Sequence, residues 1–290
     1  MLEVLLQTGV NAVYAASFMA LVAVGLVLIF GVMGVINFAH GELYMLGAYT
    51  VVYVYADHHL PFPLAVAAGL IFVGVLGIAM EHTLFRPMRS NPLGGLIVSI
   101  GMLLVLQALI VAGFGVRMEH IPPPHQAVIP LGVAGVTIPL QRLITIAAAA
   151  ILLGGLWLFL KRSRFGWALR ACAQDPEAAA LQGISLNQTA RLAMFIGAAL
   201  AGVAGALTAP LVRTYPYMGH PVIVSAFIVI IVGGMGSLEG AIVAAILYAF
   251  VSTFVTTFWD GVIADIVGLL LMLLVLVLRP NGLFGKPERA

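Results

Sequence analysis

Long apolar runs, separated by short stretches with charges or prolines, occupy most of this chain. They lie at about 11–31, 41–56, 64–80, 94–114, 143–160, 190–210, 222–232, 240–258 and 263–278. Most of them approach the roughly 20 residues that a helix needs to cross a bilayer. No alternating ten-residue strands occur, so helices are the expected spanning elements. The run at 222–232 extends about 16 Å as a helix, which predicts a half-helix that does not cross alone.

The composition agrees with a membrane protein. Of 290 residues, 62% are hydrophobic and 8% are charged, against roughly 25% charged residues in soluble domains. The sequence therefore predicts an all-α, polytopic helical bundle of about 8 transmembrane helices plus a half-helix, as a single domain over residues 1–290. The net charge of +2 gives no indication of nucleic acid as a partner. A single cysteine, Cys172, excludes an internal disulfide.

Basic residues predict the orientation, because Lys and Arg collect in short loops on the cytoplasmic side. Ten of the 13 basic residues fall in alternate connections and the tail, namely Arg86, Arg89, Lys161, Arg162, Arg164, Arg170, Arg191, Arg279, Lys286 and Arg289. The opposite side has Arg117, Arg142 and Arg213. We therefore expect the N-terminus outside, the C-terminus in the cytoplasm, an outer loop at about 115–142 and a cytoplasmic loop at about 161–189.

The cytoplasmic loop contains the signals of a short amphipathic helix. Asp175 is a typical N-cap, Pro176 suits the first helical position and Glu177 places a negative charge at the positive end of the helix dipole. Gly183 is suited to the residue after the C-cap. Such a helix can lie in a groove of another protein. The alternative is an ordinary solvated loop helix.

Two further stretches interrupt apolar runs with glycine and polar groups. The first contains Asn37, His40, Gly41 and Glu42. A charged residue at the bilayer centre costs about 2.5–3.5 kcal/mol, so Glu42 should face protein, water or the inner interface, or be a carboxylate at a helix N-terminus. Asn37 and His40 are candidates for hydrogen bonds between helices.

The second break, 233–240, follows the half-helix and contains Gly233, Gly234, Gly236, Ser237 and Glu239. Irregular backbone at this depth should line a cavity or pack against other helices. Between the two breaks, small residues recur at four-residue spacing and predict a close helix contact. They are Gly197, Ala198, Ala201, Gly202 and Gly205.

Four segments together resemble one transporter family. They are INFAHGELYMLGAY at 36–49, RACAQDPEAAALQGI at 170–184, GGMGSLEG at 233–240 and RPNGLFG at 279–285. The chain resembles the branched-chain amino-acid permeases of ATP-binding-cassette (ABC) importers, of the LivH type. The resemblance implies a permease subunit in the bacterial inner membrane that passes leucine, isoleucine or valine. Urea, short amides and other amino acids remain alternative solutes.

The resemblance also implies partners: a second homologous permease, two ATP-binding subunits and an extracytoplasmic solute-binding protein. The ATPase-coupling residues would be Arg170, Asp175, Pro176, Glu177, Ala178, Ala179 and Gly183. ATP and magnesium would be bound by the partners, because no P-loop motif occurs in this chain. The translocation path or helix breaks would involve the polar and glycine residues of the two breaks.

Other classes of function find less support. No Ser/His/Asp arrangement or carboxylate pair indicates an enzyme, and the histidines lack the partners of a metal site. A self-contained channel or secondary transporter would use Glu42, Glu239 or Asp265 for ions or protons. These residues lie near the expected helix ends, where they need no transport role. A structural scaffold is the remaining alternative.

Overall fold

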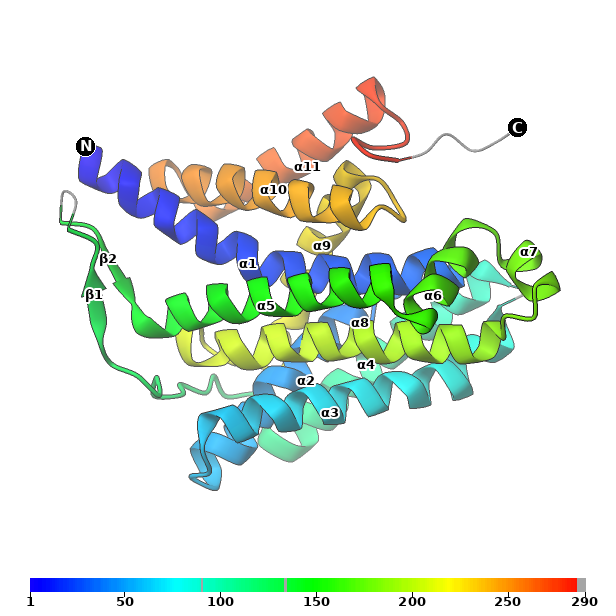
Figure 1. The fold of residues 1–290 in the computed structure, drawn as a ribbon. Helices are drawn as coiled ribbons and strands as arrows, with labels where there is room; N and C mark the ends of the chain where they lie inside the picture. The colour runs from blue at the N-terminus through cyan, green and yellow to red at the C-terminus, as the bar shows by residue number, and fades with distance from the viewer. Residues whose placement is uncertain (90, 133–134, 286–290) are drawn as a thin grey trace.

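A computed structural model describes residues 1–89, 91–132 and 135–285, and Figure 1 shows a bundle of long helices. The expected basic residues Lys286 and Arg289 lie outside the described residues. The helices are α1 (Leu2–Met33), α2 (His40–Val51), α3 (Phe62–Met80), α4 (Pro92–Phe114), α5 (Leu140–Arg162), α6 (Arg164–Gln174), α7 (Pro176–Leu181), α8 (Leu186–Thr208), α9 (Gly219–Gly233), α10 (Leu238–Phe258) and α11 (Gly261–Leu278). A π-helical segment, η1 (Val52–Asp57), continues α2, and the turns η2 (Glu81–Phe85) and η3 (Arg86–Met88) continue α3. A 3-10 turn, η4 (Ala209–Leu211), follows α8.

Seven of the described helices are long and apolar enough to cross a membrane: α1, α3 with its following turns, α4, α5, α8, α10 and α11. The 12 residues of α2 and the 6 of η1 form a further helical stretch of 18 residues. The half-helix expected at 222–232 is α9, which has 15 residues. The chain is therefore an all-α, polytopic membrane protein, as predicted.

The two ends of the bundle differ in structure. In Figure 1, α7 lies at one end and a small β-hairpin at the other, and we refer to them as the α7 end and the hairpin end. The hairpin pairs β1 (Val128–Pro130) antiparallel with β2 (Thr137–Pro139). It lies in the long loop that the sequence places at about 115–142.

The first helix begins earlier than the expected residue 11, because its first turns are bound to the hairpin. Gln7 donates a 3.0 Å hydrogen bond to the Thr137 carbonyl and accepts one of 3.1 Å from the Thr137 N–H. Arg142 donates to Asn11 and lies 5.1 Å from the centre of the Tyr14 ring. With 32 residues, α1 is about 48 Å long and exceeds the roughly 30 Å of a hydrocarbon core. The apolar pattern marks only the part inside that core.

Small residues on α8 let the central helices approach at backbone distance. A Cβ added to Gly197 would lie 2.6 Å from the Gly25 carbonyl oxygen of α1, and the reverse distance is also 2.6 Å. A Cβ added to Gly47 of α2 would meet the Gly202 carbonyl oxygen, and one added to Gly205 would meet the Tyr44 carbonyl oxygen. The predicted small-residue face is confirmed, and it makes α1 and α8 the most buried spans.

We expect Gly197→Ala to destabilise the fold, because its Cβ has no room against α1. Overpacking of this kind costs about 1–3 kcal/mol, so the midpoint of thermal unfolding in detergent should fall by roughly 3 °C or more. The matched control is Gly101→Ala on α4, where no atom lies within 4 Å of the added Cβ. Equal unfolding midpoints for the two variants would contradict the proposed contact.

Candidate functional site

The helix α7 has the end signals that the sequence predicts. The Asp175 carboxylate accepts a 2.9 Å hydrogen bond from the Ala178 N–H. At the other end, Gly183 has a φ of 81° and donates to the Ala180 carbonyl at 2.9 Å, while Ile184 donates to the Ala179 carbonyl at 3.1 Å. This pair of bonds is the Schellman C-cap, which needs a left-handed residue. The segment therefore forms a fixed turn of helix at the tip of the bundle.

A second helix, α6, precedes α7, whereas the sequence analysis expected one helix in this loop. Ser163 caps α6 by accepting a 2.8 Å bond from the Gly166 N–H. Leu169 and Cys172 bury one face of α6, and the helix packs against α5, α1 and α8. Arg170 lies on α6 rather than beside α7, and its guanidinium is 5.6 Å from the centre of the Trp167 ring. The Ser163 cap and the amphipathic pattern after it are signals that identify this helix.

The two helices leave an exposed surface at the α7 end. Leu181 is 88% exposed and Trp167 is 63% exposed. Glu177 is also exposed, and it lies in the first turn of α7. Ala179 is buried against the rest of the chain. An exposed leucine and carboxylate on one short helix, with an exposed tryptophan on the preceding helix, are suited to contact with another protein.

The first break is an unwound segment that returns into the bundle. The His40 ring nitrogen Nε2 lies 3.1 Å from the Val22 carbonyl of α1, and Val22 precedes the end of α1 by about 16 Å of helix. Thus α2 begins well inside the bundle and not at its surface. Asn37 acts locally instead of between helices, because its side chain accepts a 3.0 Å bond from the Ala39 N–H. Residues 34–39 therefore lead from the end of α1 back into the bundle as non-helical backbone.

Glu42 lies against protein in the first turn of α2. Its side chain is fully buried, and it accepts a 2.9 Å hydrogen bond from Gln107 of α4. A Cβ added to Gly219, the first residue of α9, would lie 2.8 Å from the second carboxylate oxygen. Gly41 also packs on the Gly219 backbone. The start of α2 and the start of α9 therefore meet inside the bundle, with Glu42 beside both.

Ser99 and Gln107 of α4 bind the same break, and neither is among the residues predicted from the sequence. Ser99 accepts a 3.1 Å hydrogen bond from the Phe38 N–H, and Gln107 lies two turns further along α4. Polar residues spaced by eight in an otherwise apolar helix share one face, and this spacing is the signal that identifies them.

The second break packs against the segment after α11. The Leu283 N–H donates to the Val232 carbonyl at 2.9 Å and the Phe284 N–H to the Gly233 carbonyl at 3.0 Å. Gly234 and Gly236 have φ values of 103° and 93°, which glycine adopts readily. These contacts satisfy the carbonyls at the end of α9.

The next helix, α10, begins directly after this break. Ser237 caps α10 by accepting a 3.0 Å bond from Gly240, and Glu239 is exposed in its first turn. A Cβ added to Gly31, near the end of α1, would lie 3.9 Å from the Gly236 Cα atom. The second break therefore lies near the end of α1, while the first reaches the level of Val22. The structure does not join the two breaks into one site.

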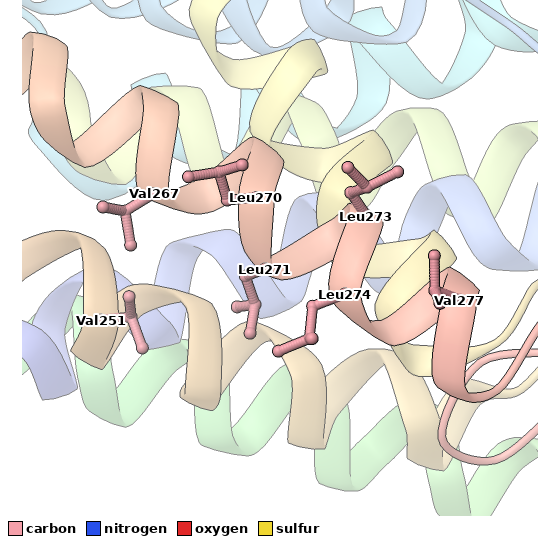
Figure 2. A pocket seen from close by; sticks show the side chains of 7 residues that line it. All are labelled: Val251, Val267, Leu270, Leu271, Leu273, Leu274 and Val277. Atoms are coloured by element: carbon pink, nitrogen blue, oxygen red, sulfur yellow. The ribbon is translucent and has the colours of Figure 1, made fainter.

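An apolar groove of about 540 Å³ lies between α10 and α11. Figure 2 shows the seven aliphatic side chains that line it, one from α10 and six from α11: Val251, Val267, Leu270, Leu271, Leu273, Leu274 and Val277. None of them offers a hydrogen bond. The groove therefore has no chemistry for holding a polar solute.

Arg89 links the end of α3 to α8 near the α7 end, and the sequence alone does not predict this contact. Arg89 donates to the fully buried Glu81 and, at 2.7 Å, to Asn187 of α8. In the sequence, Glu81 at the end of an apolar run, with basic residues just beyond it, indicates an ion pair. The contact of Arg89 with Asn187 of α8 is known only from the fold.

Comparison with a solved structure supports the class of fold. The model matches "PsaBC from Streptococcus pneumoniae in complex with Fab" with a TM-score of 0.52 and 16% sequence identity, covering 94% of this chain and 92% of the other. At this identity the likeness concerns the fold alone.

Sequence comparison identifies the family. Residues 9–276 match the model for "Branched-chain amino acid transport system / permease component", so the chain belongs to this family. It is 34% identical over 296 residues to the Pseudomonas aeruginosa "High-affinity branched-chain amino acid transport system permease protein BraD", covering 98% of this chain and 96% of that protein. It is also 34% identical over 300 residues to the protein of the same description named LivH in Escherichia coli strain K12, with the same coverage. A probable LivH from Methanocaldococcus jannaschii is 26% identical over 288 residues, covering 95% of this chain and 91% of that protein.

We expect Arg89→Ala to destabilise the protein strongly, because it leaves the buried Glu81 carboxylate without its cation. Removing one partner of a buried pair costs about 3–5 kcal/mol. The control is Arg86→Ala, which removes an exposed basic residue from the same loop and changes the loop charge equally. Thermal unfolding of both variants in detergent measures the difference. If Arg89→Ala unfolds at the same temperature as Arg86→Ala, the ion pair does not hold α3 to α8.

Proposed function

We propose that this chain is the transmembrane permease subunit of an ABC importer in a bacterial inner membrane, and that its solutes are leucine, isoleucine and valine. The observation that carries the proposal is the near full-length match to relatives named as high-affinity branched-chain amino acid permeases. Other amino acids, short amides and urea are the alternative solutes, since the buried polar groups described above do not select among them. A self-contained transporter is the alternative mechanism.

The distribution of charge supports an orientation with the α7 end in the cytoplasm. Among the described basic residues, Arg117, Arg142 and Arg213 belong to segments at the hairpin end. The remaining described Lys and Arg residues belong to segments at the α7 end or next to it. Because cytoplasmic loops are enriched in these residues, the N-terminus would lie outside and the end of α11 inside.

Energy for transport would come from partners at the α7 end. The sequence contains no G-x-x-x-x-G-K-[ST] motif, so two partner subunits would bind ATP and magnesium. Their contact surface would include Arg170 of α6 and the capped α7 helix with Asp175, Pro176, Glu177, Ala178 and Gly183. The buried Ala179 would hold α7 on the rest of the chain. A short helix with fixed ends is suited to couple movement of the partner subunits to the bundle, because α7 packs against α6 and α8 and would move them with it.

The breaks would permit relative movement of the helices that line the path. The starts of α2 and α9 are in contact through Gly41 and Gly219. The first break precedes α2 and the second break follows α9. The second break would be a hinge between α9 and α10. A second homologous permease would complete the path, and an extracytoplasmic binding protein would deliver the solute at the hairpin end.

The first experiment is to purify the tagged chain from its native membrane in mild detergent and identify stoichiometric partners by mass spectrometry. Two ATPase chains and a second permease support the importer. ATP-dependent uptake of radiolabelled leucine into proteoliposomes, with the native binding protein, then tests the solute. A chain that purifies alone after gentle cross-linking, and still transports, would establish the self-contained mechanism instead.

The charge reversal Glu177→Lys should leave the protein inserted but weaken its association with the ATPase subunits. A positive charge at the N-terminus of α7 opposes the helix dipole and changes the exposed contact surface. We expect at least a fivefold loss of co-purified ATPase, measured by quantitative mass spectrometry. The control Glu177→Gln removes the charge without reversing it and should retain most of the association. Normal ATPase recovery and normal uptake by the lysine variant would count against the coupling role of α7.

A further inference from the structure

One carboxylate in the spans lies on the exposed surface of the single chain. Asp265 is exposed in α11, five residues into a helix of 18 residues that is otherwise apolar around it. It has no hydrogen bond or ion pair to any other described residue. A charged side chain that faces lipid costs free energy, and this cost increases from the ends of a span toward its centre. Asp265 therefore needs water, a partner subunit or a ligand in front of it.

Hydroxyl groups from two other helices lie against the side of α11 that carries Asp265. The Ser225 and Tyr248 hydroxyls, from α9 and α10, are 2.9 Å apart. The Tyr248 ring packs on Gly268 of α11, where an added Cβ would lie 2.8 Å from Cε2 and 3.6 Å from the hydroxyl oxygen. Asp265 precedes Gly268 by three residues and so shares its side of α11. Ser252 follows Tyr248 by four residues on α10 and so lies one turn further along the same side of that helix.

The surroundings of this group are aliphatic. Val224 precedes Ser225 on α9, and Val262, Ile266 and Leu269 lie within about one turn of Asp265 on α11. All four are exposed in the single chain. The junction of α9, α10 and α11 therefore combines one carboxylate, three hydroxyls and an accessible apolar surface.

We propose that Asp265, Tyr248, Ser225 and Ser252 form a transient binding site for the solute inside the membrane, and that the solute is a zwitterionic aliphatic α-amino acid. This inference rests on the proposed function and assigns part of its path. The Asp265 carboxylate pairs with the α-ammonium group, whose three N–H donors need acceptors. The hydroxyls donate to the α-carboxylate. Ser225 and Tyr248 use one of their two hydroxyl protons for the hydrogen bond between them, which leaves one for the solute, and Ser252 supplies a second. The exposed valine, isoleucine and leucine side chains contact the aliphatic part.

The hydroxyls also explain why the site would bind weakly. It contains no described cation to pair with the α-carboxylate, so neutral donors alone hold that group, and neutral hydrogen bonds are weaker than charge-assisted ones. A subunit that receives solute from a delivery protein has to release it on the other side. A single ionic contact gives recognition of the ammonium group without strong retention.

The test uses the intact importer complex, purified from native membrane and reconstituted with its binding protein. We expect Asp265→Asn to reduce ATP-dependent leucine uptake at least tenfold while the recovery of partner subunits stays unchanged. Isoleucine and valine uptake should fall by the same factor, because the ammonium group is common to all three. Asp265→Glu keeps the charge and should retain more uptake than Asp265→Asn. The matched control is Asp260→Asn on the same helix, where the side chain caps Val262 and asparagine caps equally well.

Occupancy of the site gives a second readout that does not depend on transport. In an S225C variant, saturating leucine should slow labelling by a membrane-permeant maleimide at least threefold, and adding D265N should abolish this protection. The native Cys172 is buried, and the protein that keeps Ser225 gives the background labelling.

Three outcomes would overturn the inference. Leucine uptake by Asp265→Asn at the wild-type rate excludes a role in binding. Loss of the second permease from that variant would show that Asp265 pairs with the partner subunit. Labelling of S225C that leucine does not slow would exclude occupancy. A wild-type complex that assembles but imports no branched-chain amino acid would contradict the proposed function itself, whereas import by wild type and Asp265→Asn alike would contradict only the site.

Discussion

Backbone contact between helices at pairs of small residues is the constraint on which this bundle depends. In lipid, apolar side chains gain little by packing on each other instead of on acyl chains, so association relies on close fit and hydrogen bonds. Gly197 on Gly25 and Gly202 on Gly47 bring α8 against α1 and α2 with no side chain between them. This contact holds α2 in place although it begins inside the bundle. The His40 bond to the Val22 carbonyl then fixes its start.

A helix that begins inside a membrane leaves backbone groups to be satisfied, and the chain meets this need locally. Asn37 accepts from the Ala39 N–H, and Ser99 accepts from the Phe38 N–H. At the end of α9, the Leu283 and Phe284 N–H groups reach the carbonyls of residues 232 and 233. Each break is thus supported by another segment: α4 supports the first and the segment after α11 supports the second. Movement of either supporting segment would alter the break that it holds. A change at the periphery of the bundle would therefore reach its interior.

The sequence predicts those features whose cause is local and misses those whose cause is tertiary. Spans follow from apolar runs, and the ends of α7 follow from Asp175 and Gly183, because caps depend on neighbouring residues. The extension of α1 to Leu2 depends on Gln7 meeting Thr137, 130 residues away. The Arg89 bond to Asn187 and the Gln107 bond to Glu42 likewise join distant parts of the chain. A polar residue in an apolar run indicates that a partner is needed, but only the fold identifies that partner.

Three carboxylates of the spans, Glu42, Glu239 and Asp265, differ in burial, in hydrogen-bond partners and in position along their helices. Glu42 is fully buried, bonded to Gln107 and enclosed between α2, α4 and α9, so a solute cannot reach it without opening the bundle. Glu239 lies in the first turn of α10, where the helix dipole and the end of the span account for it. Asp265 lies in the second turn of α11, and it has no hydrogen bond or ion pair to another described residue. If acidic groups in this chain were a proton pathway, they would be expected to lie close together. Here Glu42 contacts α4 and α9, Glu239 lies in the second break, and Asp265 lies by the hydroxyls of Ser225 and Tyr248, an arrangement that suits one solute contact better than a relay.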